Sequence, residues 1–187
     1  MEEKAVPVSP IVTLVLPLLA FGTGAVRAQS GRMAGHGGRM GEHDRRFIEM
    51  MVPHHQDAIE MAQKAVQFAK HPELLPFAQK IIDVQTAENQ QMRTLYRQWY
   101  GRELPGTTPQ PYTWESDEAF LQEMITHHQM GVHMARMEVR MGRRAPLREL
   151  ARGMVSGQTA EIAQMSEWLK EWYPQTSDYT RQAHPCR

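Results

Sequence analysis

The chain has 187 residues, with 21 Lys and Arg against 21 Asp and Glu, so its formal net charge is zero. A neutral chain lacks the basic composition that is typical of nucleic-acid-binding domains. The single cysteine excludes an internal disulfide framework and any cysteine-rich zinc site. The unusual residues are the 14 methionines and 9 histidines. Because thioethers and imidazoles are ligands of soft metals, the composition raises copper binding as a hypothesis.

The N-terminal segment is predicted to be an export signal. A short polar start precedes the apolar run Ile11–Phe21, and Val26-Arg27-Ala28 matches a cleavage site with small residues. The apolar run is too short to span a bilayer well. We therefore expect residues 1–28 to be a signal peptide and the mature protein to be exported to a bacterial periplasm or the extracellular space, without membrane contact. An uncleaved anchor is the alternative, because Glu2 and Glu3 weaken the positive charge of the signal.

Two segments lie outside the expected fold. Residues 29–43 are glycine-rich, which predicts a flexible leader. A mobile metal-capturing arm is a second interpretation, since the leader carries Met33, His36, Met40 and His43. Residues 175–187 are expected to be a loose tail, in which Cys186 is an inert thiol, with a ligand or an intermolecular disulfide as the alternatives.

The rest of the chain is one motif written twice. A shift of 73 residues aligns FIEMMVPHHQDAIEMA at Phe47–Ala62 with FLQEMITHHQMGVHMA at Phe120–Ala135, without a gap. The same shift aligns QTAE at 85–88 with QTAE at 158–161. Such an internal duplication predicts two copies of one structural unit.

Each copy is predicted to form a helical hairpin. In repeat one, residues 44–101, Asp44 is expected to cap a helix that ends before Pro72, and a second helix follows to Gly101. In repeat two, residues 117–174, the two helices mirror this arrangement.

The proline-rich stretch 101–115 is predicted to connect the two hairpins. We found no convincing strand pattern. The predicted fold class is therefore all-α, an antiparallel four-helix bundle over residues 44–174 built from two duplicated hairpins.

Polar residues fall on the inward faces of these helices. At 100° per residue they are His55, Gln85 and Glu88 in one copy and His128, Gln158 and Glu161 in the other. A buried polar group without a partner costs about 1–3 kcal/mol. Two interpretations stay open: His–Glu pairs that hold the bundle together, or a metal inside or beside it. Thioethers lie one turn away on the same helices, since Met51 precedes His54 and Met124 precedes His127.

A methionine stripe follows one flank of the third predicted helix. It consists of Met130, Met134, Met137 and Met141, with His133 beside them. The same flank of the first helix reads Asp57, Met61, Lys64 and Phe68. The stripe is either a packing surface for the core or a partner, or a set of soft-metal ligands.

The donor types favour Cu(I), and Ag(I) as its mimic. Zinc would leave the methionines unused, and neither copy has the Glu-x-x-His pattern of a di-iron bundle before its histidine pair. The candidate ligands are Met51, His54, His55, Met61, Met124, His127, His128, Met130, His133, Met134, Met137 and Met141. We expect Gln85, Glu88, Gln158 and Glu161 to orient the histidines rather than to bind the metal.

The two HHQ blocks, each followed by QTAE about 30 residues on, resemble the bacterial family called domain of unknown function 305. The resemblance covers residues 44–173. It implies a ferritin-like four-helix fold, export in many members, and copper binding or copper tolerance in some. The residues that carry over by motif are His54, His55, Gln56, Met61, Gln85 and Glu88, and His127, His128, Gln129, Met134, Gln158 and Glu161.

We therefore expect an exported soft-metal-binding protein that buffers or carries copper by stoichiometric capture. The sequence contains no nucleophile–base arrangement, phosphate loop or cofactor fingerprint, so we do not predict an enzyme. The expected partners are the metal ion and a protein that donates or accepts it, whereas nucleic acid is not expected and the oligomeric state is left open. Two alternatives remain: a structural or interaction module with a methionine contact stripe, and a metal-dependent oxidase of the ferritin-like type.

Overall fold

The computed structural model describes residues 41–108, 112–113 and 115–175, and these residues form four helices. The helices are α1 (Glu42–Phe68), α2 (Leu74–Tyr100), α3 (Asp117–Met141) and α4 (Ala145–Trp172). The described part of the chain contains no strand. The predicted all-α four-helix fold is thus confirmed. The expected signal peptide, most of the leader and the tail residues from 176 on, with Cys186, lie outside the described residues.

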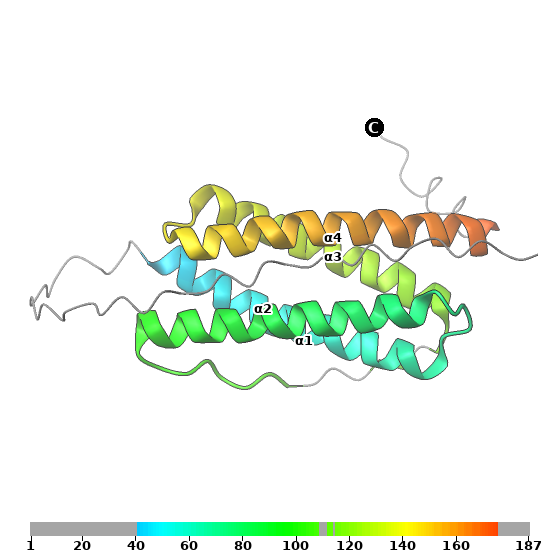
Figure 1. The fold of residues 1–187 in the computed structure, drawn as a ribbon, viewed down its shortest axis with the longest axis horizontal. Helices are drawn as coiled ribbons and strands as arrows, with labels where there is room; N and C mark the ends of the chain where they lie inside the picture. The colour runs from blue at the N-terminus through cyan, green and yellow to red at the C-terminus, as the bar shows by residue number, and fades with distance from the viewer. Residues whose placement is uncertain (1–40, 109–111, 114, 176–187) are drawn as a thin grey trace, which may run out of the picture. The chain divides into compact units, whose positions relative to one another are not determined.

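The helices pair as two antiparallel hairpins. α1 packs against α2, α3 packs against α4, and the two hairpins meet through α1 and α3. Figure 1 shows α2 and α4 in front of α1 and α3, with residues 101–108 leaving the end of α2 and running back along the bundle. One long connection of this kind is the connectivity of ferritin-like bundles. Within the described residues, no helix is both long and apolar enough to span a bilayer.

A pseudo-two-fold relation links the hairpins, because each one closes the turn of the other. The buried Asp44 carboxylate accepts hydrogen bonds from the backbone N–H of Arg143 and Arg144, at 2.8 and 3.1 Å. The buried Asp117, 73 residues later, accepts from the backbone N–H of Lys70 at 3.0 Å and of His71 at 3.0 Å. The expected role of Asp44 as a cap of its own helix is therefore wrong: α1 begins one turn earlier, after Gly41, with no side-chain cap.

Helix boundaries differ from the predicted ones where these tertiary bonds act. α1 ends at Phe68 and α2 begins only at Leu74, since the backbone of Lys70 and His71 turns to donate to Asp117. α1 is continuous through Pro53. Ser116 caps α3, because its side chain accepts from the backbone N–H of Ala119 at 3.2 Å.

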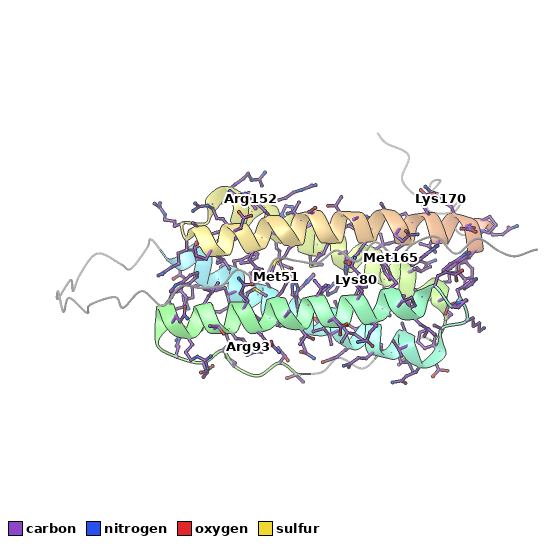
Figure 2. The ribbon with its side chains drawn as sticks, in the orientation of Figure 1. Met51, Lys80, Arg93, Arg152, Met165 and Lys170 are labelled. Carbon is purple, nitrogen blue, oxygen red and sulfur yellow. The ribbon has the colours of Figure 1, made fainter. Side chains whose placement is uncertain are left out.

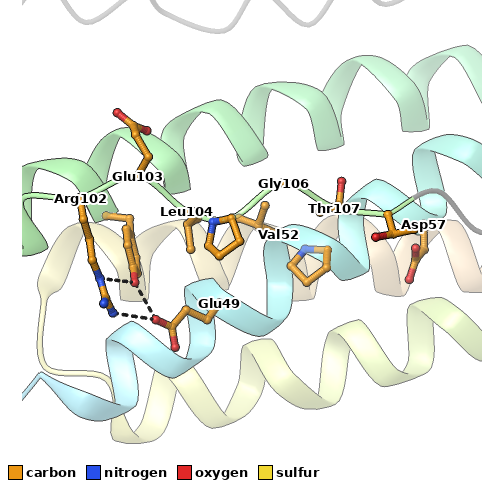
Figure 3. A pocket seen from close by; sticks show the side chains of 12 residues that line it. Glu49, Val52, Asp57, Arg102, Glu103, Leu104, Gly106 and Thr107 are labelled. Carbon is orange, nitrogen blue, oxygen red and sulfur yellow. Dashed lines mark hydrogen bonds and ion pairs between the residues drawn. The ribbon is translucent and has the colours of Figure 1, made fainter.

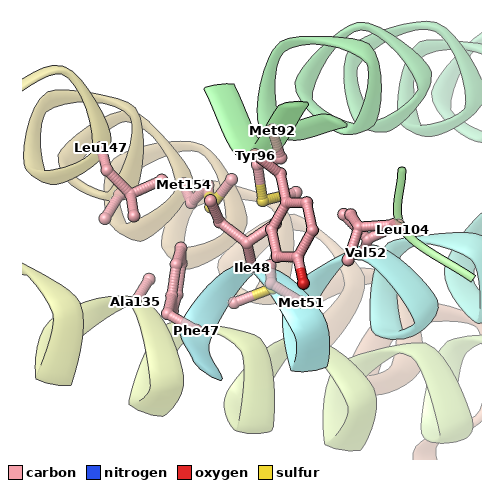
Figure 4. Packing of buried hydrophobic residues seen from close by; sticks show 11 residues of the cluster. Phe47, Ile48, Met51, Val52, Met92, Tyr96, Leu104, Ala135, Leu147 and Met154 are labelled. Atoms are coloured by element: carbon pink, nitrogen blue, oxygen red, sulfur yellow. The ribbon is translucent and has the colours of Figure 1, made fainter. Parts of the chain in front are cut away.

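The core consists of two apolar clusters with polar side chains between them along each helix. In Figure 4, Met51, Met92, Met154 and their neighbours fill the first cluster. The second cluster, like the first, contains side chains of both copies: Met124 and Met165 of repeat two pack there with Ile81 of repeat one. Figure 2 shows Met51 and Met165 between the helices, whereas charged side chains such as Lys170 lie outside. The predicted core faces of α1 and α3 are therefore correct.

Candidate metal centre

Two histidines meet where the pseudo-two-fold relation brings equivalent residues together. His54 of α1 and His127 of α3 stack with ring centroids 3.7 Å apart. His54 Nε2 donates a hydrogen bond to the His127 carbonyl oxygen at 3.2 Å. Burial, together with a smaller effect of the neighbouring imidazoles, lowers the pKa of His54 to about 3 and that of His127 to about 2. Both rings are therefore neutral at physiological pH.

The other two motif histidines form the predicted pairs with glutamate. His55 Nε2 lies 2.7 Å from Glu88 Oε2, and His128 Nε2 lies 3.0 Å from Glu161 Oε2. Burial alone would raise the pKa of Glu161, but the hydrogen bond from His128 and the charge of Lys80 outweigh it and lower that pKa. A carboxylate on Nε2 orients the ring and leaves Nδ1 for another ligand. Nδ1 of both histidines is buried without a hydrogen-bond partner in the described residues.

The glutamines of the motif complete this polar layer. Both side-chain polar atoms of Gln85 and of Gln158 are buried and have no hydrogen-bond partner in the described residues. Gly131 lies close to this layer, and a Cβ there would require the Gln158 amide to shift. Nevertheless, no three His, Cys, Asp or Glu side chains of the described residues are grouped closely enough to hold a metal ion.

A different donor set gathers where the start of α1 meets the end of α3. A pocket of about 350 Å³, which we call the Met pocket, is lined by His43, Arg46, Phe47, Met50, His133, Met134, Met137 and Met141. It combines four thioethers and two imidazoles from two antiparallel helices. Met50 and Met141 are 48% and 54% exposed, so solvent reaches the sulfur-bearing side chains. Arg140 donates to Met137 Sδ at 2.8 Å, which fixes that sulfur as an acceptor.

Sequence reasoning found four of the six Met and His residues of this pocket and missed the other two. The predicted residues His133, Met134, Met137 and Met141 lie together as expected. His43 and Met50 were not among the candidate ligands, because His43 was assigned to the leader and Met50 points away from the core face of α1. The signal that could have found them is their spacing of seven residues, which places both on one flank of a helix.

A buried carboxylate lies under the Met pocket. Glu138 is fully buried, and its Oε2 lies 3.3 Å from Nε2 of His43. Burial and the nearby charge of Asp44 raise the pKa of Glu138 to about 8. Gly142 makes room for this side chain, since a Cβ at that position would overlap the Glu138 carboxylate.

The remaining candidate ligands are dispersed. Met51 and Met124 are fully buried in the two apolar clusters, as Figure 4 shows for Met51. Met130, 56% exposed, lies apart from the other members of its stripe and lines a second pocket with Met61 and His127. The structure thus divides the predicted ligands into the polar layer, the Met pocket, this second pocket and the core.

A pocket on the other side of α1 from these ligands is not needed to explain them and is a poor match to soft metals, because its lining is of another kind. It has a volume of about 530 Å³ and lies between α1 and residues 102–108. Figure 3 shows that Glu49 in this pocket is already engaged, accepting from the Tyr96 hydroxyl at 2.6 Å and from Arg102 at 3.4 Å. Among the described residues, no Met or His side chain lines it. The Met pocket therefore has the more informative chemistry.

Several solved structures are similar to this chain over the whole four-helix bundle. CopM in the Cu(I)-bound form is 42% identical, with a TM-score of 0.65 over 70% of this chain and 97% of that one. CopM in an Ag-bound form obtained by co-crystallisation is 43% identical, with the same TM-score and the same coverage. A DUF305 protein from Streptomyces coelicolor is 27% identical, with a TM-score of 0.61 over 69% of this chain and 93% of that one. No curated protein matches the chain.

The sequence profile of the family described as "Domain of unknown function (DUF305)" matches the chain twice. The matches cover residues 44–113 and 111–169. The first begins within α1 and the second ends within α4, so together they span both hairpins. The resemblance of the two HHQ blocks and the duplicated hairpin thus have one explanation: the chain belongs to the DUF305 family.

Proposed function

We propose that this protein binds Cu(I), and Ag(I) as its chemical mimic, in the Met pocket, and that it acts as an exported copper buffer or carrier. The observation that carries the proposal is the pocket itself, in which thioethers and imidazoles of α1 and α3 gather at the surface. Neutral sulfur ligands select Cu(I) among the available metals. They need no deprotonation before they bind.

The ligands that we propose are His43, Met50, His133, Met134, Met137 and Met141. A soft ion would compete with the hydrogen bond from Arg140 to the sulfur of Met137. Arg140 is exposed and returns to solvent when the ion binds. We leave Met51 and Met124 out of this set, because they are fully buried among apolar side chains.

The solved relatives support this choice of metal. Crystals of CopM contain Cu(I), Ag or Cu(II), and CopM is 40–43% identical to this chain over 70% of its length. Identity at this level over the whole bundle makes a related metal chemistry the simplest proposal for this chain.

Export and stoichiometric capture complete the proposal. We assign residues 1–28 to a cleaved signal peptide, which would deliver residues 29–187 to the periplasm or the extracellular space. Copper is the cargo in this scheme, so the protein needs no catalytic group. The Met- and His-bearing leader that precedes α1 would enter the same scheme as an accessory arm.

A Cu(I) competition titration tests the proposal. The chain from Gln29 is titrated anaerobically against a chromogenic Cu(I) chelator, together with Met137→Leu/Met141→Leu, which retains apolar volume and removes two thioethers. The matched control is Met165→Leu, which removes a thioether from the core at a site outside the Met pocket. We expect binding tighter than micromolar that the double variant weakens and the control does not. A folded protein without such binding, or with equal affinity in all three, contradicts the proposal.

A second candidate function has its own observation. The side chains of Met50, Met130 and Met141 are each about half exposed, at 48%, 56% and 54%, which also fits a contact surface for another protein. The same Met→Leu variants separate the two functions. Leucine preserves an apolar contact, so partner binding would survive the exchange, whereas metal binding would not.

A further inference from the structure

A further pocket lies where the last turns of α3 meet the first half of α4. We call it the Arg pocket; it has a volume of about 280 Å³ and is lined by Arg136, Val139, Arg140, Arg152, Val155 and Ser156. The two valines are half-buried and form apolar walls, whereas the three arginines are exposed. Among the described residues, no Asp or Glu lines it. Three cationic side chains therefore surround an apolar pocket that has no carboxylate in its lining.

The positive charges of these arginines are only partly balanced by the protein. Arg136 has no hydrogen bond or ion pair within the described residues. Arg140 donates to the sulfur of Met137, a neutral acceptor, at 2.8 Å. Arg152 pairs with Glu149 at 2.7 Å, but both side chains are exposed, and exposed ion pairs are weak. An anion at the pocket would therefore interact favourably with all three guanidinium groups.

The equivalent surface of the first hairpin has the same apolar walls and lacks the arginines. A shift of 73 residues relates Val139 and Val155 to Val66 and Ile82. The same shift relates Arg136, Arg140, Arg152 and Ser156 to Gln63, Gln67, Gln79 and Asp83. Gln79 donates to Asp83 at 2.9 Å there, so the helix pair packs with uncharged side chains at the three positions. The arginines are not required by the fold, which favours a role in binding.

The Arg pocket lies in the basic half of a charge-polarised bundle. This half consists of residues 41–54, 89–108 and 130–158, and it contains all eleven arginines of the described residues against six Asp and Glu. The other described residues carry four lysines against twelve Asp and Glu. Figure 2 shows Arg93 and Arg152 in one half and Lys80 and Lys170 in the other. A negatively charged surface would therefore attract the end with the Arg pocket and repel the opposite end.

We propose that the Arg pocket binds the surface of a bilayer that contains anionic phospholipids, with a lipid phosphate held by the guanidinium groups of Arg136, Arg140 and Arg152. Guanidinium groups match phosphate oxygens in geometry and charge. The valines and the methylene groups of the arginines supply the apolar contact that a lipid offers beside its phosphate and an acidic protein surface does not. Clusters of basic side chains are the usual means of binding anionic lipids.

This partner differs from the expectation that the exported chain makes no membrane contact, which followed from the length of its apolar run. The binding proposed here uses charge at the bilayer surface and needs no spanning helix. It is also independent of copper, because the Arg pocket shares no lining residue with the Met pocket.

Vesicle flotation of the metal-free chain from Gln29 tests the proposal. This chain contains all four helices and lacks the apolar run Ile11–Phe21, which would itself bind a bilayer. The vesicles contain phosphatidylglycerol and phosphatidylcholine in equal amounts, or phosphatidylcholine alone. The test variant is Arg136→Gln/Arg140→Gln/Arg152→Gln, which introduces the residues of the first hairpin. The control is Arg93→Gln/Arg97→Gln/Arg102→Gln, which removes the same charge from the same half outside the pocket.

The parent should float with the phosphatidylglycerol vesicles and not with phosphatidylcholine alone. The test variant should lose at least about tenfold in affinity, and the control less than about threefold. Arg136→Gln alone should weaken binding measurably, and it keeps the test valid if the triple variant folds poorly.

Three results would overturn the proposal. The first is a folded parent that floats with neither kind of vesicle, and the second is an equal loss in both triple variants, which would mean attraction by net charge alone. The third is saturable binding of inorganic phosphate or of soluble polyglutamate by a parent that ignores vesicles, which would assign the pocket to a free anion or to an acidic protein.

Discussion

The Met pocket, where the start of α1 meets the end of α3, has a counterpart where the start of α3 meets the end of α1. A shift of 73 residues relates the two regions, and both have a buried phenylalanine, Phe47 in one and Phe120 in the other. Met134 is matched by Met61, but four other lining positions change character. Positions equivalent to His133, Met137, Met50 and Met141 are Glu60, Lys64, Glu123 and Phe68, and we call this region the charged counterpart.

The two regions are held together in the same way but carry different side chains. Asp44 and Asp117 make equivalent bonds at the two ends, so the backbone is held in the same way. In the charged counterpart, Lys64 Nζ pairs with Glu115 at 3.2 Å and is partly exposed. The same helix pair therefore packs with charged residues at these positions. The methionines of the Met pocket are not required by the fold, which leaves metal or partner binding as their explanation.

The largest expected effect comes from making the Met pocket resemble its charged counterpart. The double variant His133→Glu/Met137→Lys places the residues of Glu60 and Lys64 at the equivalent positions. We expect Cu(I) affinity at the Met pocket to fall about 100-fold or more, because two soft ligands are lost and a cation is added. The melting temperature should change little, and circular dichroism checks this in parallel with chelator competition. Affinity within twofold of the parent would rule out the Met pocket as the site.

The two capping aspartates should differ in their effect on stability. Asp117→Ala leaves two backbone N–H groups and the His71 ring without their acceptor, and we expect a loss of about 2–4 kcal/mol in urea unfolding. Asp44→Ala should cost less, since it also removes the negative charge that raises the pKa of Glu138. The exposed Asp83 provides the control substitution. A larger loss for Asp44→Ala would show that Glu138 is not destabilised by its neighbour.

Low pH should destabilise the polar layer, in which His54 of one copy stacks on His127 of the other. The pKa values of His54 and His127 are about 3 and 2 in the folded protein, below the ordinary value of 6.5. The unfolded chain binds these protons first as pH falls below 6.5, so stability is retained above 6.5 and lost below it. At pH 4.5 each histidine should cost about 2–3 kcal/mol. Urea unfolding between pH 7.5 and 4.5 measures this slope. His54→Asn should flatten it and the exposed His133→Asn should not; equal slopes in both would contradict the assignment.

Glu138 is another difference between the two regions, since the equivalent residue of the charged counterpart is Ala65. We expect its effect on stability to be the smallest of these. The pKa of Glu138 is raised from 4.5 to about 8, so the folded protein keeps a proton that the unfolded chain releases. The contribution of Glu138 to stability is therefore highest below pH 4.5 and declines as pH rises towards 8. Glu138→Gln should gain about 1–2 kcal/mol at pH 7.5 and nothing at pH 4. Thermal unfolding of both proteins at the two pH values decides; a constant difference would exclude titration of Glu138.

The duplicated motif predicted the fold because its periodicity is local. Residues such as Met51, Ala58 and Ala62 recur at helical spacing, and that spacing alone identifies the buried face. The His55–Glu88 and His128–Glu161 pairs followed from the same reasoning, since each pair joins adjacent helices of one hairpin. Helix ends were predicted less well, because Lys70 and His71 bond to an aspartate of the other hairpin.

What the sequence by itself determined is the helices, the duplication and the types of side chain available as candidate metal ligands. Only the tertiary structure decided how those ligands are grouped. Met130 and Met134 are neighbours on one helix, yet they line different pockets, because each faces a different part of α1. Met50 and His43 join the Met pocket only when α1 and α3 pack in opposite directions. The physical reason is that helical periodicity acts over a few residues, whereas a binding site depends on contacts between segments about 90 residues apart in the chain.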